Sequence, residues 1–313
     1  MSLVIKEIKG RDYYYSFLSY RLVKKTKSFS RYIGLKKPTE KELRAIEDKF
    51  RTELIQKLSG KTYSCLLVDN DEVIKSLLFS VAFDKKYQKL TSLRRRKYDI
   101  DSMVRFTLTT LTTEEVDVDL SDVTNALIKA SRLTLRERIS KNMLSAIESI
   151  KRPHKLDKRY LLELHNTIMA TFEVKNPGKL RERQVYLYRK GSLGSSNDRE
   201  LRYRPPAHNK IVKLLGEFLQ WYNKTDLNPV EKAAFAHYRL YKIHPFLDGN
   251  KRVCRLIFNK TLFDGKFPLI NVSVNKDAYF EALIKSVETG NPKEFVEFVF
   301  KQYYQQVKIF LMS

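Results

Sequence analysis

The chain has 313 residues, and 60 lysines and arginines against 36 acidic residues give it a formal net charge of +24. Its length provides one large domain or two modest ones, and 42% hydrophobic with 31% charged residues is a globular composition, which argues against a fibrous or disordered chain. Cys65 and Cys254 form no metal-spaced cluster, no signal peptide is recognisable, and no run reaches the ~18 apolar residues that cross a membrane, so we expect a soluble, cytoplasmic protein with no membrane contact.

Residues 1–105 are expected to form a basic N-terminal region that contains a β-hairpin followed by helices. Residues 4–34 are rich in aromatic and β-branched side chains, with a polar bend at Lys24–Ser28. Their tyrosines suit either sheet packing or stacking against nucleic acid bases. A helix is predicted to begin at Thr39, because Glu42 stands three residues later as in a capping box, and to end at Gly60. No nucleic acid-binding motif identifies the function of this region.

Residues 106–313 are expected to be mostly helical, because apolar residues recur there at a spacing of three and four. One strand is predicted at 181–189, where aromatic and β-branched side chains cluster. The predicted helices of this region cover 119–150 in one or two pieces, 156–173, a segment that begins at Pro205-Pro206, 229–241, 250–263, 276–287 and 292–310.

The segment from His244 to Arg255 carries a constellation of groups suited to phosphate chemistry. It joins two predicted helices, and Gly249 stands where the second helix begins. A helix N-terminus presents free N–H groups and a positive dipole to an anion. His244 titrates near neutrality and suits a general base, and Asp248 can hold Mg²⁺ through oxygen. Lys251, Arg252 and Arg255 add positive charge, which completes the set of groups expected for phosphoryl or nucleotidyl transfer.

This segment resembles the signature of the Fic/Doc (Fido) family, His-Pro-Phe-x-Asp/Glu-Gly-Asn-Gly/Lys-Arg with a second arginine three residues later. Further stretches extend the resemblance over roughly residues 120–305: they are "KLRERQVYL" (179–187), "YRPPAHNKI" (203–211), "AFAHYRLYKIHPF" (234–246) and "KDAYFEAL" (276–283). The resemblance implies a Fic-fold helical bundle with a β-hairpin flap over residues 106–313.

The resemblance also implies a role for each residue of the segment. His244 would deprotonate a Ser, Thr or Tyr hydroxyl of a target protein, and Asp248 would hold Mg²⁺ on the phosphates. Backbone amides at Gly249 and Asn250 would form the anion hole, assisted by the Asn250 side chain. Arg252 and Arg255 would contact the phosphates of ATP, and Phe246 would pack in the core. Gln184, Val185 and Tyr186 belong to the flap, which would dock the target peptide as an added strand.

Lys251 leaves the donor chemistry open. Most AMP-transferring members of the family have Gly at this position, whereas Doc-type members, which transfer the γ-phosphoryl group, have Lys there with Ala before the Asn. This chain combines Gly249 with Lys251. We place AMP transfer first, because the chain resembles the long Fic architecture.

Regulation is the second departure from the family pattern. Many Fic proteins carry an inhibitory helix with the pattern Ser/Thr-x-x-x-Glu-Gly/Asn, whose Glu pairs with the second arginine. Alignment on Leu133-Thr134-Leu135 puts Lys129 at the Glu position. We therefore expect a degenerate inhibitory helix, with Lys129 facing either Arg255 and the γ-phosphate or the solvent.

The sequence thus predicts a protein adenylyltransferase that moves AMP from ATP, with Mg²⁺, onto a hydroxyl of a target protein. One alternative is a Doc-like protein kinase. Another is a basic nucleic acid- or ribosome-associated binding protein whose Fic core is inactive. The positive surface keeps nucleic acid open as a partner, and a homodimer is likewise left open.

Overall fold

A computed structural model describes residues 2–188 and 201–313 of the chain, and these residues are mostly helical. The strands are β1 Ser2–Ile8, β2 Arg11–Arg21, β3 Thr26–Gly34, β4 Leu187–Tyr188 and β5 Leu201–Tyr203. The α-helices are α1 Glu40–Ser59, α2 Asn70–Gln88, α3 Ser92–Thr113, α4 Leu120–Ile128, α5 Leu135–Lys151, α6 Lys158–Met169, α7 Ile211–Lys224, α8 Pro229–Ile243, α9 Asn250–Asp264, α10 Lys276–Thr289 and α11 Lys293–Met312. None of the helices in this part of the chain is long and apolar enough to span a bilayer.

The chain divides into two compact units. The N-terminal unit comprises residues 1–89, 226–228 and 304–313, and the helical unit comprises residues 90–225 and 229–303. The division that the sequence suggested between residues 105 and 106 falls inside α3. This domain boundary stays a prediction.

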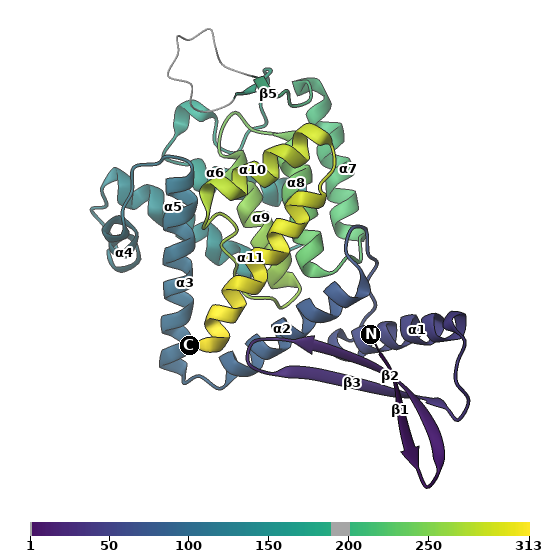
Figure 1. Cartoon of the computed structure of the whole chain (residues 1–313). Helices are drawn as coiled ribbons and strands as arrows, with labels where there is room; N and C mark the ends of the chain where they lie inside the picture. Colours follow the sequence, from purple (N-terminus) through teal and green to yellow (C-terminus); the bar gives the residue numbers. More distant parts are fainter. Residues whose placement is uncertain (1, 189–200) are drawn as a thin grey trace. The chain divides into compact units, whose positions relative to one another are not determined.

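In the N-terminal unit, β1, β2 and β3 form an antiparallel sheet in that order (Figure 1). Helix α1 begins with the expected capping box, in which the Thr39 side chain accepts from the Glu42 N–H and the Glu42 carboxylate accepts from the Thr39 N–H. The helix ends at Gly60, whose φ of 76° is the left-handed conformation of a C-cap. The two helical ends that the sequence predicted here are therefore confirmed.

Helix α9 is the central element of the helical unit. Figure 1 shows it among α5, α6 and α8, and it contacts all three. Every residue from Arg252 to Leu262 is buried. A helix that is buried all round must be surrounded by other elements. The body of the helix that follows the predicted site is therefore held by packing on every side.

The structure corrects two sequence predictions in this unit. The helix expected from Pro205-Pro206 begins only at Ile211, and a single 3₁₀ turn at His208–Lys210 precedes it. The strand expected at 181–189 is restricted to Leu187–Tyr188 among the described residues, and the last predicted position lies outside them.

Candidate functional site

The loop between α8 and α9 holds the predicted site residues in an unusual backbone conformation. His244 has a φ of 50° and Gly249 a φ of 75°. A Cβ atom on Gly249 would lie 2.8 Å from the Met169 sulfur and 3.3 Å from the His165 ring. Only glycine satisfies both the left-handed backbone and this close approach.

His244 is buried, with 7% of its surface exposed. Its Nδ1 lies 3.3 Å from the Tyr241 carbonyl oxygen. A carbonyl oxygen only accepts, so Nδ1 carries the proton and Nε2 keeps its lone pair. Burial lowers the pKa of His244 to about 4, which keeps the ring neutral at physiological pH. The neutral tautomer with a free Nε2 is the form that a general base requires.

His165, which the sequence analysis did not single out, supports this loop from α6. Its ring stacks on Phe246 with 3.7 Å between centroids and 3° between planes. His165 Nε2–H donates to the Asp248 carbonyl oxygen over 3.1 Å, while its Nδ1 accepts from the Gly178 N–H at 2.9 Å. Phe246 is fully buried, which agrees with the packing role expected for it.

Arg181 and Asn250 fix the rest of the loop. The Arg181 Nε donates to the His244 carbonyl oxygen at 2.8 Å, and its backbone N–H donates to the Pro245 carbonyl oxygen at 2.9 Å. The Asn250 side chain pairs with both backbone groups of Phe246, at 3.0 and 2.9 Å. The Asn250 side chain therefore fixes the loop through one of its two N–H donors. Its expected help in binding an anion stays a prediction.

Asp248 is the carboxylate closest in sequence to these groups. Its Oδ1 accepts from the Gly249 N–H at 2.6 Å and lies 3.4 Å from Arg252 Nη2, and 42% of its side chain is exposed. The described residues contain no group of three or more His, Cys, Asp or Glu that would hold a metal without other ligands. Mg²⁺ is usually bound through one or two carboxylates together with substrate phosphates, and a single accessible carboxylate fits that mode.

Two buried arginines lie on the first turns of α9, whose start lacks a side-chain cap. Gly249, the N-cap of α9, provides no side-chain hydrogen bond to the first N–H groups of this helix. Arg252 and Arg255 are 3% and 0% exposed, and Nε and Nη1 of both are buried without a hydrogen-bond partner in the described structure. Unpaired buried cationic donors are costly to a fold unless an anion satisfies them.

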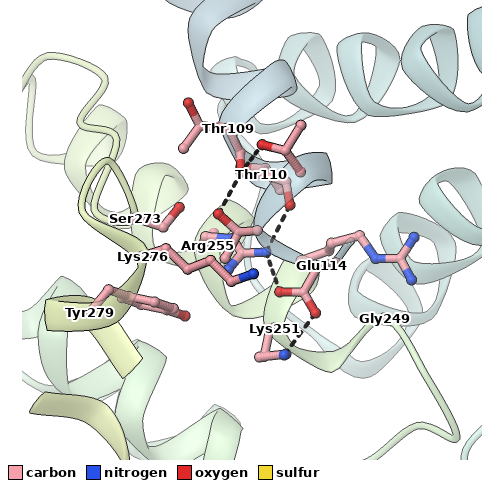
Figure 2. A network of polar contacts seen from close by, with 12 residues as sticks. Thr109, Thr110, Glu114, Gly249, Lys251, Arg255, Ser273, Lys276 and Tyr279 are labelled. Atoms are coloured by element: carbon pink, nitrogen blue, oxygen red, sulfur yellow. Dashed lines mark hydrogen bonds and ion pairs between the residues drawn. The ribbon is translucent and has the colours of Figure 1, made fainter. Parts of the chain in front are cut away.

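Glu114, at the end of α3, lies between two cations of α9 (Figure 2). Arg255 Nη2 donates to one carboxylate oxygen at 2.6 Å, and Lys251 Nζ lies 2.9 Å from the other. Arg255 Nη2 also donates to the Thr110 carbonyl oxygen at 3.1 Å. Burial by itself would raise the pKa of Glu114, but the charges of Arg255 and Lys251 outweigh it and lower this pKa to about 2.

Glu114 corrects the expectation for Lys129. The structure places Lys129 at the end of α4, where its Nζ lies 2.5 Å from Glu137, and the carboxylate at Arg255 comes from Glu114. Thr110 and Glu114 match the Thr-x-x-x-Glu part of the inhibitory pattern. Glu115 follows where the pattern has Gly or Asn, and its φ of 60° is the conformation that those residues favour. Because Glu115 does not match the last position of the pattern, the motif was not recognised in the sequence.

The three flap residues lie at the entrance to β4. The Gln184 side chain donates to the carbonyl oxygens of Val185 and Pro205, at 3.0 and 2.8 Å. Tyr186 is 43% exposed. Strand β4 follows them and pairs with β5, with Leu187 opposite Tyr203. Their role in docking a target stays a prediction.

Comparison with family models and curated proteins places this site in a known context. A model of the Fic/DOC family matches residues 155–262. The chain is 29% identical over 154 residues to "Protein adenylyltransferase fic-1" of Caenorhabditis briggsae, a match that covers 48% of this chain and 28% of that protein. It is 31% identical over 142 residues to "Protein adenylyltransferase Fic" of Drosophila erecta, covering 44% and 26%. The matches thus span about a quarter of the relatives' length.

Solved structures show that the fold extends beyond this segment. A Fic family protein from Desulfovibrio desulfuricans superposes with a TM-score of 0.64 at 20% identity, over 80% of this chain and 77% of that one. A fragment of Fic-1 from C. elegans gives a TM-score of 0.62 at 19% identity, over 88% and 78%. The helical bundle predicted from the sequence is thereby confirmed as a Fic fold.

Proposed function

Because this chain carries a Fic/DOC family domain over residues 155–262, we propose that it transfers AMP from ATP to a hydroxyl group of a target protein. The observation that carries the proposal is the pair of buried arginines, Arg252 and Arg255, whose unpaired donors lie on the first turns of α9. A triphosphate supplies the oxygens that these donors lack. The names of the curated relatives support the same chemistry.

In the proposed reaction, His244 acts on the acceptor hydroxyl of the target. The hydroxyl proton passes to the free Nε2, and the hydroxyl oxygen forms a bond to the α-phosphorus of ATP. The bond from the α-phosphorus to the bridging oxygen breaks, and pyrophosphate leaves with that electron pair. The negative charge of a bound triphosphate raises the pKa of His244 from about 4 toward neutrality, which strengthens the base in the complex.

The chain's other groups bind and orient the nucleotide. The N–H groups at the start of α9 and the donors of Arg252 and Arg255 face the phosphate charge. Asp248 is the residue that would hold Mg²⁺, and bound Mg²⁺ would neutralise charge on the phosphates. Tyr186 and Val185, before β4, would position the target backbone by strand addition.

We also propose that Glu114 restrains the reaction. Its two oxygens bind Arg255 and Lys251, two of the cations that the phosphates need. A triphosphate and this carboxylate compete for the same donors, so release of Glu114 precedes productive binding.

Transfer of the γ-phosphoryl group is the second candidate, and Lys251 is the observation that favours it. The ammonium group lies 2.9 Å from Glu114, so it is available to phosphate once that carboxylate is displaced. Lysine binds phosphate as a point charge and accommodates either orientation of the nucleotide.

ATP labelled on either the α- or the γ-phosphate distinguishes these reactions. Glu114→Gln protein is incubated with a lysate, Mg²⁺ and each label, beside the wild type and a Glu115→Gln control. We expect α-label on protein with Glu114→Gln, and little with the wild type or with Glu115→Gln. Label from γ-ATP alone would replace AMP transfer with kinase action, and no protein label from either nucleotide would reject the proposed function.

A further inference from the structure

The strand register sorts the side chains of the N-terminal sheet onto two faces. On β2, Ser16, Leu18 and Tyr20 are buried on one face. This face packs against the helices of the same unit: the Tyr20 hydroxyl donates to Asp71 of α2 over 2.6 Å, and Arg31 pairs with Glu53 of α1 at 2.8 Å. The alternate residues of β2 therefore point away from α1 and α2.

The opposite surface, called here the open face, carries four aromatic rings. Tyr13, Tyr15 and Phe17 come from β2, and Tyr32 of β3 lies directly opposite Tyr15. Ring centroids of Tyr15 and Tyr32 are 5.4 Å apart, and those of Tyr13 and Tyr32 are 6.0 Å apart. Tyr32 is 50% exposed. The rings of Tyr13 and Tyr15 each contact Tyr32, and all four aromatic residues are at least partly accessible to a ligand.

The charges on the open face are all positive. By the register, Lys6 lies opposite Tyr13, Ile8 opposite Arg11, and Arg21 opposite Thr26. Both acidic residues of the sheet, Glu7 and Asp12, lie opposite each other on the other face. Within the sheet as the structure describes it, no acidic side chain lies on the open face. The face is completed by hydroxyl and apolar side chains, namely Val4, Ser19, Ser28 and Ser30.

One cation of the open face lies over a ring, and the surrounding turns add to the charge. Lys6 Nζ lies 4.8 Å from the centroid of the Tyr15 ring. Residues 1–37 contain ten lysines and arginines and two acidic residues. Such a region attracts a polyanion more strongly than it attracts a neutral partner. The rings provide contacts that an acidic peptide does not use and that a nucleic acid base does.

We propose that the open face binds single-stranded nucleic acid. Bases stack on Tyr15, Phe17 and Tyr32, and phosphates meet Lys6, Arg11 and Arg21. Alternate residues of a strand lie roughly 6.7 Å apart, about twice the 3.4 Å axial rise between successive nucleotides of one duplex strand. The rings therefore suit bases that are unstacked, as in a single strand. This proposal does not depend on the proposed transferase activity, and either can fail alone.

Fluorescence anisotropy of labelled oligonucleotides with the full chain tests the proposal. The probes are a 20-nucleotide RNA, a DNA of the same sequence, and the duplex of that DNA. Comparison of the RNA and DNA shows which of them is the better ligand. We expect either single strand to bind at least tenfold more tightly than the duplex. Equal binding of duplex and single strands would overturn the proposal. No binding at low salt would also overturn it and would instead favour a protein as the partner of this face.

A matched pair of variants separates stacking from general charge attraction. Tyr32→Leu removes the aromatic ring and keeps its bulk, whereas Tyr32→Phe keeps the ring. We expect Tyr32→Leu to weaken binding about tenfold, which is in the lower part of the range measured for the loss of one stacked base. We expect Tyr32→Phe to bind within about twofold of the wild type. Equal affinities of the two variants would contradict base stacking. Tyr32 is half exposed, so both variants should fold, which their thermal unfolding verifies.

Charge is tested by the salt dependence of the same binding. Arg21→Gln on the open face is compared with Lys27→Gln, which pairs with Tyr20 on the other face. Loss of one phosphate contact lowers the slope of log K against log salt by about 0.7 for a single strand. We expect this change for Arg21→Gln and none for Lys27→Gln. The same slope in both variants would contradict the assigned face.

Discussion

The two cationic regions of this protein differ in burial, and that difference separates two kinds of anion binding. In the helical unit, Arg252 and Arg255 are 3% and 0% exposed and keep unpaired donors. On the open face of the N-terminal sheet, Lys6, Arg11 and Arg21 are exposed. Buried charges lose hydration and need a specific partner, whereas exposed charges are hydrated and screened by salt.

The net charge of the protein does not by itself indicate its function. The charge of +24 is mostly a property of the surface, and it indicates anionic partners without choosing among them. The proposed reaction depends instead on a few buried groups. Changes to these buried groups should therefore have large and specific effects.

The largest expected effect concerns His244. In the Glu114→Gln background, His244→Ala should reduce label transfer from α-labelled ATP by about 10²- to 10⁴-fold, the range for loss of a general base. His154→Ala, which alters an exposed histidine, is the control and should leave transfer unchanged. A His244→Ala rate within a few fold of its parent would remove this ring from the reaction.

Loss of the Glu114 carboxylate should lower stability and raise activity together. Glu114→Gln leaves Arg255 buried beside a neutral side chain, which should reduce the free energy of unfolding by about 3 kcal/mol. Glu115→Gln breaks a half-exposed pair with Lys276 at 3.5 Å, so its effect should stay within about 0.5 kcal/mol. Urea denaturation measures both. Equal stabilities of the two variants would mean that the buried pair contributes no more than an exposed one.

Acid should destabilise the buried site through its histidines. Burial lowers the pKa of His165 and His244 to about 4 and that of His237 to about 3, against about 6.5 in an unfolded chain. The unfolded state therefore binds more protons between pH 6.5 and about 4, and stability falls as the pH falls through that window.

Glu114, with its pKa lowered to about 2, extends this loss below pH 4.5, because its carboxylate stabilises the fold only while ionised. Urea denaturation at pH 7.0 and 4.5 should show a loss of about 2 kcal/mol for each ring. His237→Gln should reduce the loss by one ring's share. Equal stability at the two pH values would contradict the assigned burial.

The effect of Lys251→Ala on label transfer should have opposite signs with and without the Glu114 carboxylate. While Glu114 is present, Lys251→Ala removes one of the two ion pairs that hold the Glu114 carboxylate. This change should raise α-label transfer about two- to fivefold, as expected for the loss of a partly exposed pair. In the Glu114→Gln background the same change removes a phosphate contact and should lower transfer. A change in the same direction in both backgrounds would show that Lys251 does not hold Glu114.

The sequence was informative where the signal is local. Thr39 with Glu42 and Gly60 predicted both ends of α1, and the spacing from His244 to Arg255 predicted one site on a loop and a helix start. Phe246 was assigned to the core, and the structure stacks it on His165. The first two inferences join residues less than about two dozen positions apart, whereas the ring that Phe246 stacks on was not predicted.

The misses involve distant contacts. Glu114 is 141 residues from Arg255, and nothing in the periodicity of α3 indicates that pairing. Alignment on Leu133-Thr134-Leu135 selected Lys129, because those residues match the family and Glu115 does not. Arg181 and His165 act through backbone carbonyls of a remote loop, and a carbonyl carries no sequence signal. The two hydrogen bonds between the Asn250 side chain and the Phe246 backbone were likewise not predicted.

Calorimetric titration of ATP into three proteins tests the central claim, that Glu114 occupies the donors meant for phosphate. The proteins are the wild type, Glu114→Gln, and Glu114→Gln with Arg255→Gln. We predict that Glu114→Gln binds ATP at least tenfold more tightly than the wild type, and that Arg255→Gln cancels the gain. Equal affinity of all three proteins would contradict the account.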